Sequence, residues 1–326
     1  FSYSETNMGA GGGYYSDPLT QVYMMSPMTP VKTEDGEWNF DTSTGYNPVA
    51  LRSDEGDKSL AKQYHATISP YVQFNILPGL TWMTKGGVDL YHVDEYGYWS
   101  FLNKQGSSLN GMGEDGYTTR SLLSITNTLN YIKSFGDHHL NIMLGQEGQQ
   151  TNIKASYLAG SNYPVEYLNE VTLASVPGSA STAHYKLILG SWFSNVQYDY
   201  ANKYYLSASF RTDGSSRFGA NNRWASFWSV GGKYRITEEK FMQPAKNWLS
   251  DLTIRASYGT TGNQDVGDHT DADYLSWIVA RDVFGFGYNY NNTPGSAHEQ
   301  FGNPDLKWKK TAKFNVGIDA LLFDRI

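Results

Sequence analysis

The sequence contains no cysteine among its 326 residues. Without thiols the chain has no disulfide framework, no thiolate metal or redox site and no cysteine nucleophile. No run approaches the roughly eighteen apolar residues of a membrane-spanning helix, so the sequence predicts no transmembrane helix. No basic block is present and the formal net charge is −7, which argues against nucleic acid as a main partner.

Aliphatic side chains are also scarce for a chain of this length. Hydrophobic residues make up only 40% of the sequence, whereas Tyr (25), Phe (15) and Trp (9) supply much of the apolar surface. Together with 33 glycines, this composition favours short strands with rings at an interface over the helical blocks of a soluble enzyme. A barrel strand needs only about 9–11 alternating residues to cross a membrane, so the lack of long apolar runs does not exclude one.

Signatures of catalysis are missing too. The histidines show no HExxH or similar spacing, and no G-x-S-x-G elbow joins a strand to a helix. Neither glycine run, at 9–13 or at 111–113, opens a helix in a βαβ unit, which argues against a phosphate loop. We interpret His138 and His139, beside Asp137, as part of a solvated turn. The sequence therefore predicts no enzyme, no catalytic residue, no metal and no cofactor.

The chain does contain strict alternation of apolar and polar residues between 203 and 263. Side chains two residues apart lie on the same face of a strand, so the pattern predicts three strands, each with one apolar and one polar face. The apolar set is Tyr204, Leu206, Ala208, Phe210, Trp228, Val230, Gly232, Tyr234, Ile236, Leu252, Ile254, Ala256 and Tyr258. This arrangement fits a sheet with an apolar medium on one side and water on the other.

Similar signals recur along the chain and predict an all-β fold. We expect residues 1–63 to be mostly loop, with the end of one strand near residues 1–4. Strands are expected at 64–76, 80–90, 119–133, 138–151, 184–200, 203–211, 227–236, 250–258 and 311–323. Short connections at 77–79, 134–137, 201–202 and 237–249 alternate with long ones at 91–118, 152–183, 212–226 and 259–310. This alternation favours an antiparallel transmembrane β-barrel with short periplasmic turns and long external loops.

Aromatic residues gather where the strands are expected to meet the membrane surfaces. Those beside the inner turns are Tyr198, Tyr200, Tyr204, Tyr205 and Trp248, and those near the outer end of a strand are Trp224 and Trp228. Such rings form interfacial girdles in membrane barrels. Cross-strand aromatic packing in any antiparallel sheet is the alternative explanation.

Four cations fall on the polar faces of these strands: Arg211, Lys233, Arg235 and Arg255. In an open barrel they would line the lumen and contact cargo or a plug, whereas on a soluble sheet they would be solvated. Arg211 would also pair with Asp213, beside Arg217, and hold the shape of the DGSSRFG loop. We favour this structural role for Arg211.

Four stretches resemble one known family. They are YYLSASFRTDGSSRFGANNRW, FWSVGGKYRITEEKFM, WLSDLTIRASYGTTGNQ and FGNPDLKWKKTAKFNVGIDALLFDRI. They are similar to the barrel of SusC/RagA TonB-dependent outer-membrane receptors of Bacteroidetes, and the resemblance extends over residues 64–326. Lys309 departs from the family pattern, in which an acidic residue is usual at that position.

The resemblance implies part of a 22-stranded barrel in the lipid of the Gram-negative outer membrane. Members of this family import oligosaccharides or peptides under a SusD-like surface lipoprotein lid, and the TonB–ExbB–ExbD complex supplies energy. Neither a plug domain nor a TonB box is recognisable, and both ends of the sequence look like cuts. We therefore expect residues 1–326 to form one partial barrel domain, with strands and external loops over 64–326 and the plug outside it.

The long loops, especially 152–183 and 259–310, are expected to contact the lid or the cargo. The aromatic candidates for these contacts are Trp277, Phe284, Phe286 and Tyr288. They would stack on sugar rings, pack against the lid or only stabilise their own loop. A scaffolding barrel without transport of its own is the alternative function. A secreted β-domain that binds or hydrolyses glycans is a third, against which the apolar strand faces argue.

Overall fold

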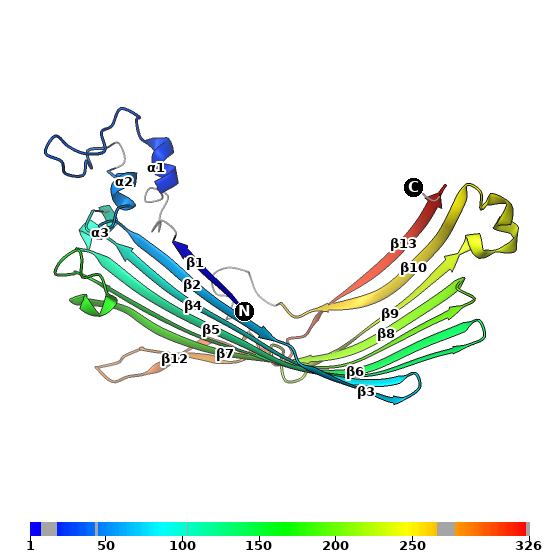
Figure 1. Cartoon of the computed structure of the whole chain (residues 1–326). Helices are drawn as coiled ribbons and strands as arrows, with labels where there is room; N and C mark the ends of the chain where they lie inside the picture. The colour runs from blue at the N-terminus through cyan, green and yellow to red at the C-terminus, as the bar shows by residue number, and fades with distance from the viewer. Residues whose placement is uncertain (8–17, 43–44, 103, 266–277, 324–326) are drawn as a thin grey trace. The chain divides into compact units, whose positions relative to one another are not determined.

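The computed structural model describes residues 1–7, 18–42, 45–102, 104–265 and 278–323. Antiparallel strands dominate these residues, as Figure 1 shows. They divide into two compact units, which are described separately. Unit 1 comprises residues 1–67, 88–121 and 152–185, and unit 2 comprises 68–87, 122–151 and 186–326. None of the described helices is long and apolar enough to cross a membrane.

One large sheet follows the order of the chain, with neighbouring strands paired in sequence. Its strands are β1 (Ser2–Asn7), β2 (Lys58–Ile68), β4 (Leu80–Trp99), β5 (Met112–Phe135), β6 (His138–Ser161), β7 (Val176–Tyr200), β8 (Tyr204–Ser215), β9 (Trp224–Arg235), β10 (Leu249–Asn263) and β13 (Lys309–Leu322), with β3 (Tyr71–Leu77) also paired to β4. Such a meander needs only hairpin connections, and it confirms the predicted all-β, antiparallel fold class.

The strand expected at 64–76 is two strands, β2 and β3. The break falls at Ser69 and Pro70, between the two elements. Proline has no N–H to donate to a ladder, so the pairing is interrupted there. The Pro70 carbonyl still accepts a 2.9 Å bond from the Gly86 N–H, which keeps the chain beside β4.

Several expected loops are strands instead. The connections expected at 91–118 and 152–183 shrink to 100–111 and 162–175, because β4, β5, β6 and β7 all continue past the predicted ends. The predicted alternation of short and long connections also fails once, since the loop 216–223 is shorter than the turn 236–248. Residues 91–97 (YHVDEYG) carry polar groups at both odd and even positions. Where neither face is apolar, hydrophobic periodicity cannot mark a strand.

In unit 1, short helices accompany the strands. They are α1 (Pro18–Met24), α2 (Pro48–Leu51), α3 (Lys104–Ser108) and the 3-10 turn η1 (Val171–Leu173). The Asn47 side chain caps α2 by accepting bonds of 3.1 Å from the N–H groups of Val49 and Ala50. Tyr98 and Tyr163 form the buried centre of this unit, with ring centroids 5.5 Å apart.

In unit 2, the apolar faces of the strands are exposed and not packed in a core. Leu206 is 61% exposed, Val230 49% and Val316 61%. Cross-strand partners share a face, and the register pairs Ala208 with Val230, and Ala256 with Val316. The outward side chains form one continuous surface, here called the apolar band: Leu206, Ala208, Phe210, Trp228, Val230, Ile254, Ala256, Tyr258, Phe314, Val316 and Ile318.

The tight β7–β8 turn shows how the register of this sheet is set. Ala201 and Asn202 have φ values of 53° and 55°, which is the left-handed geometry of a hairpin turn whose twist matches the strands. The turn places Tyr200 opposite Tyr204 and fixes the pairing along the whole of β8. Unit 2 also contains a separate hairpin of β11 (Val283–Phe286) and β12 (Ser296–Gln300).

Candidate functional site

Arg211 projects from the polar face of β8 and is held by neighbouring groups. Its Nε donates to Asp213 Oδ1 at 2.6 Å, and its Nη2 donates to Ser191 Oγ at 2.8 Å. The guanidinium also lies over the Phe193 ring, 5.4 Å from the centroid. The expected pair with Asp213 is therefore present. Arg217 has a different partner, Asp265, at 3.0 Å.

Arg235 ends β9 and belongs to a network at the strand ends. Its Nε lies 3.3 Å from Asp251 Oδ1, which also accepts from Thr237 Oγ1 at 3.0 Å. Its Nη2 lies 3.6 Å from Glu238 Oε1. Two carboxylates thus neutralise this cation, and its role in the structure is to tie the β9–β10 turn to both strands.

Lys233 and Arg255 lie directly opposite each other on β9 and β10. Lys233 Nζ stands 4.2 Å above the centroid of the Tyr205 ring, and no carboxylate among the described residues lies within 4.0 Å of it. Arg255 has one exposed partner, Asp319, at 3.3 Å. Like charges facing each other across a sheet repel, so this pair forms the least compensated positive spot of the four predicted cations.

A hollow of about 790 Å³ lies against this part of unit 2. Polar side chains in its lining include Asp199, Tyr205, Ser207, Lys233, Arg255 and Asn315. A Cβ on Gly317 would lie only 2.5 Å from Arg255 Nε. Glycine at this position therefore leaves room for the Arg255 side chain. The structure therefore brings Lys233 and Arg255 together in one hollow of mixed polar and apolar lining, while Arg211 and Arg235 are not in this lining.

The predicted aromatic candidates lie on or beside the β11–β12 hairpin. Phe284 is 54% exposed, Phe286 84% and Tyr288 52%, whereas Trp277 lies outside the described residues. The hairpin adds a contact that the sequence did not indicate. His298 is stacked on Phe284, with centroids 4.4 Å apart, and meets the edge of Phe301 at 4.3 Å. Phe284, His298 and Phe301 thus form one aromatic cluster.

The base of this long connection is fastened to the loop 216–223. Gly219 N–H donates to the Leu306 carbonyl at 3.1 Å, and Asn221 N–H donates to the Pro304 carbonyl at 3.2 Å. A Cβ on Gly219 would lie 2.0 Å from the Pro304 oxygen, so only glycine permits this approach. We call this contact between 216–223 and 303–308 the clasp.

Aromatic packing completes the clasp. Trp308 is 9% exposed, and its ring centroid lies 4.7 Å from that of Phe218 and 5.6 Å from that of Phe227. Its Nε1 donates to the Arg223 carbonyl at 2.9 Å. The SSRFGANNRW and NPDLKW stretches are distant in sequence but pack against each other. Their contact fixes the base of the loop 264–308.

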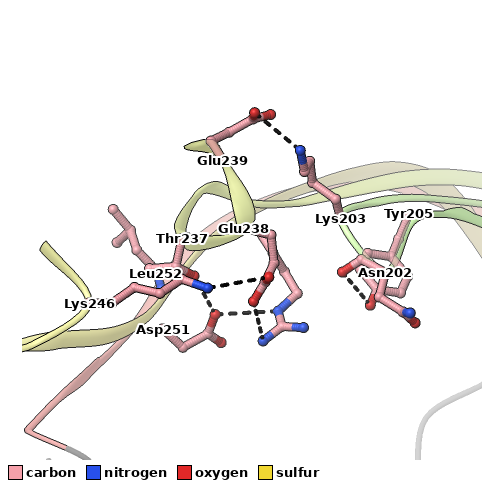
Figure 2. A network of polar contacts seen from close by, with 10 residues as sticks. Asn202, Lys203, Tyr205, Thr237, Glu238, Glu239, Lys246, Asp251 and Leu252 are labelled. Carbon is pink, nitrogen blue, oxygen red and sulfur yellow. Dashed lines mark hydrogen bonds and ion pairs between the residues drawn. The ribbon is translucent and has the colours of Figure 1, made fainter. Parts of the chain in front are cut away.

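At the opposite end of these strands, a carboxylate joins three elements. Glu239 accepts hydrogen bonds from Tyr204 Oη at 2.7 Å and Tyr234 Oη at 2.9 Å, and it pairs with Lys203 Nζ at 3.1 Å. Figure 2 shows Lys203 and Glu239 pointing toward each other, beside the contacts of Asp251 with Thr237. The hydrogen bond from Tyr204, followed by those from Tyr234 and Lys203, holds the pKa of Glu239 below its usual range.

A row of aromatic rings crosses the strands at this same end. Successive centroid distances are 4.8 Å from His138 to Tyr200, 6.4 Å from Tyr200 to Tyr204 and 5.0 Å from Tyr204 to Tyr234. The rings stack across strands, which confirms the expected cross-strand packing. Tyr200 and Tyr204 are exposed, and their place in an interfacial girdle stays a prediction. The prediction was wrong for Tyr205, which lies under Lys233 on the polar face. Alternation prevents Tyr204 and Tyr205 from sharing one face.

Sequence reasoning did not find Glu239 or Trp308. Glu239 contacts Lys203 across 36 positions, and Trp308 contacts Arg223 across 85. Contacts over such separations do not produce a periodic pattern in the sequence. The Tyr pairs beside the turns and the tryptophan of the KWKK stretch were the local features that could have drawn attention to them. No group of three or more His, Asp or Glu side chains that could hold a metal occurs in the parts of the chain that the structure describes.

Comparison with known proteins supports this architecture. The family described as TonB dependent receptor-like, beta-barrel matches residues 2–326. TonB-dependent receptor P39 of Formosa agariphila is 31% identical over 300 residues, which are 89% of this chain and 27% of the relative. TonB-dependent receptor SusC of Bacteroides thetaiotaomicron is 29% identical over 342 residues, covering 97% of this chain and 32% of SusC.

Among solved structures, the RagAB peptide transporter matches with a TM-score of 0.73 and 28% identity, over 82% of this chain and 29% of the other. The chain thus spans about a third of the length of these relatives. The relatives are named as receptors or transporters and not as enzymes. With the exposed apolar band, the polar opposite face and a match over almost its whole length, this chain belongs to the TonB-dependent receptor β-barrel family and resembles its SusC and RagA members.

Proposed function

We propose that this chain forms part of an outer-membrane nutrient importer of the SusC type. Cargo, an oligosaccharide or an oligopeptide, passes through the barrel, which is gated through TonB and covered by a SusD-like lipoprotein. The observation that supports this best is that β8, β9, β10 and β13 carry apolar side chains on one face of the sheet and polar side chains on the other. Their apolar side chains are exposed on one side, and a hollow that contains the polar side chains of Lys233 and Arg255 lies against the same strands. Lipid on one side and a watery passage on the other explain both features.

The likeness to RagAB and SusC supports import of a large polar cargo. One structural relative is named as a peptide transporter and one sequence relative as SusC, and both match this chain at similar identity. Passage through such a barrel requires no covalent chemistry. The lumen must instead offer polar groups that hold cargo weakly, and Lys233 and Arg255 are the exposed cations that fit this role.

The β11–β12 hairpin is the proposed contact for cargo or lid. Its exposed rings, Phe284, Phe286 and Tyr288, offer flat apolar surfaces that stack on sugars or pack against a protein. The clasp holds the base of this connection to the strand ends, so the rings are presented from a fixed support. Trp277 is proposed to act with them, although it lies outside the described residues.

The test begins with the full-length protein, purified in detergent from its native membrane. Mass spectrometry identifies co-purifying proteins and bound small molecules. A SusD-like lipoprotein together with a glycan or a peptide is the expected result and names the cargo class. Co-purification with secretion or barrel-assembly components, without ligand, would instead support the scaffolding alternative and refute import.

A variant of the hairpin separates its contribution from that of the barrel. Replacing Phe284, Phe286 and Tyr288 with alanine should weaken lid or cargo retention at least roughly tenfold, because each lost aromatic contact is worth about 0.5–1.5 kcal/mol. Trp192→Ala is the matched control, since this ring is 60% exposed on a strand outside the hairpin. Equal retention by the two variants would show that the hairpin is not a contact.

A further inference from the structure

A second hollow of unit 2, of about 390 Å³, is lined by residues of β4, β5, β6, β7 and β8. Its apolar lining includes large side chains that are 36–60% exposed: Trp82, Leu144, Trp192 and Phe210. Two amides, those of Asn127 and Gln146, also belong to the lining. We call the hollow formed by these six residues the band groove.

The strand register places the band groove on the face of the apolar band. Phe210 is a member of that band, and Ser194 is paired directly with it. Trp192 lies two residues from Ser194 on the same strand, so it shares this face. The groove is therefore a depression in the surface that faces lipid in the proposed membrane placement.

Gln146 is a polar residue on this apolar face. Its neighbour Glu147 lies 3.8 Å from Arg211 on the polar face, and successive side chains of a strand alternate, so Gln146 lies on the opposite face. Leu144, two residues away on the apolar face, is 52% exposed. An amide beside such a leucine is costly in hydrocarbon unless its donors and acceptors find partners.

A chain of hydrogen bonds reaches Gln146 and ends there. Thr84 Oγ1 donates to Asn127 Oδ1 at 2.6 Å, and Asn127 Nδ2 donates to Gln146 Oε1 at 3.0 Å. Both bonds run in the same direction, which leaves Gln146 Nε2 as the terminal donor. Among the described residues, no acceptor lies within hydrogen-bonding distance of this nitrogen. The band groove thus combines apolar walls with an open N–H group.

The chemistry of the groove selects its ligand. The apolar walls require a hydrocarbon chain, and the open N–H group requires an acceptor such as a carbonyl oxygen. An ester-linked acyl lipid has both, because a carbonyl joins each of its chains to the headgroup. A polar group on a lipid-facing surface is a sign of a specific contact rather than of general solvation by lipid.

We propose that the band groove binds one acyl chain of a membrane glycerolipid, whose ester carbonyl accepts a hydrogen bond from Gln146 Nε2. Leu144 and Trp192 contact the chain. Asn127 is the positioning residue, because its bond to Gln146 Oε1 fixes the amide and leaves Nε2 free for the lipid. The inference rests on the proposed placement of the barrel in a membrane.

Native mass spectrometry of the full-length protein in detergent tests this proposal. The protein is mixed with phosphatidylethanolamine that has ester-linked chains or with its ether-linked analogue, which has the same chains and no carbonyl. The wild-type protein should retain the ester lipid roughly threefold to tenfold better, the effect of one net hydrogen bond. Gln146→Leu should abolish this preference. Gln150→Leu, on the same face of β6 but outside the groove lining, is the matched control and should keep it.

Equal retention of the two lipids by the wild-type protein overturns the proposal without reference to any variant, and so does an unchanged preference in Gln146→Leu. Either result leaves the membrane placement intact while the protein still requires detergent. A protein that stays dispersed without detergent and retains no lipid overturns both. Cross-linking of Leu144→Cys to a neighbouring protein in the native membrane would assign the groove to a protein partner and also overturn the proposal.

The positioning role of Asn127 has its own test. Asn127→Leu should lower the preference for the ester lipid at least roughly twofold, because Gln146 loses the donor that orients its amide. Retention of the ether lipid should stay unchanged, since the apolar walls are intact. An equal loss of both lipids would show a merely structural effect and refute the positioning role.

Discussion

Removal of the Trp308 ring should open the clasp. The side chain is 9% exposed and packs between Phe218 and Phe227, so Trp308→Ala removes a buried aromatic and leaves a cavity. Such substitutions cost about 3–5 kcal/mol. Because about 1.4 kcal/mol corresponds to a factor of ten, local opening of the clasp should become roughly two to three and a half orders of magnitude more frequent.

Hydrogen exchange measures this opening directly. The amides of Gly219 and Asn221 donate to carbonyls on the other side of the clasp, so their exchange rates report its closed fraction. Trp308→Phe retains most of the ring but leaves the Arg223 carbonyl without its donor, and about 1 kcal/mol predicts roughly fivefold faster exchange. Trp192→Ala is the control. Unchanged exchange in Trp308→Ala, or an equal change in Trp192→Ala, would refute the clasp as a cooperative contact.

Three further outcomes are expected. Gly219→Ala should also open the clasp, because its Cβ would clash with the Pro304 carbonyl, and proteolysis within 278–302 should accelerate. Leu206→Arg on the apolar band should reduce folding into vesicles, by less than the about 2–4 kcal/mol of a site at the bilayer midplane because Leu206 lies two residues from Tyr204 at the strand end, whereas Ser207→Arg on the polar face should be tolerated. The pKa of Glu239 is lowered from 4.5 in the folded protein. Its contribution is therefore fully present above that pH and lost as the pH falls through the lowered value, so exchange over 236–248 should rise only in acid and stay flat in Glu239→Gln.

The strand faces of unit 2 were predictable because alternation is a local property. Alternation within this one strand is enough to assign each apolar residue between Tyr204 and Phe210 to a face of the sheet. The structure places these residues on the predicted face. The outer part of β4 was not predictable in this way. Its residues are polar on both faces, so the period-two signal is lost although the backbone pairing continues.

The contacts that hold the connections depend on distant pairs. Nothing around Trp308 indicates that its indole will meet the Arg223 carbonyl, and nothing near Lys203 indicates Glu239. Both pairings follow only once the strand order is fixed. Ion-pair partners could not be predicted for the same reason. The sequence placed four cations on polar faces but could not show which of them lie beside a carboxylate: Arg211, Lys233, Arg235 and Arg255.

The clasp has a consequence for how this protein diversifies. Both ends of the connection between β10 and β13 are anchored, with Gln264 Oε1 accepting from Ser215 Oγ at 3.2 Å and residues 303–308 bound to 216–223. The entropy of closing a loop grows only slowly with its length. The segment between the anchors can therefore change in length or sequence at little cost to the strands that carry it.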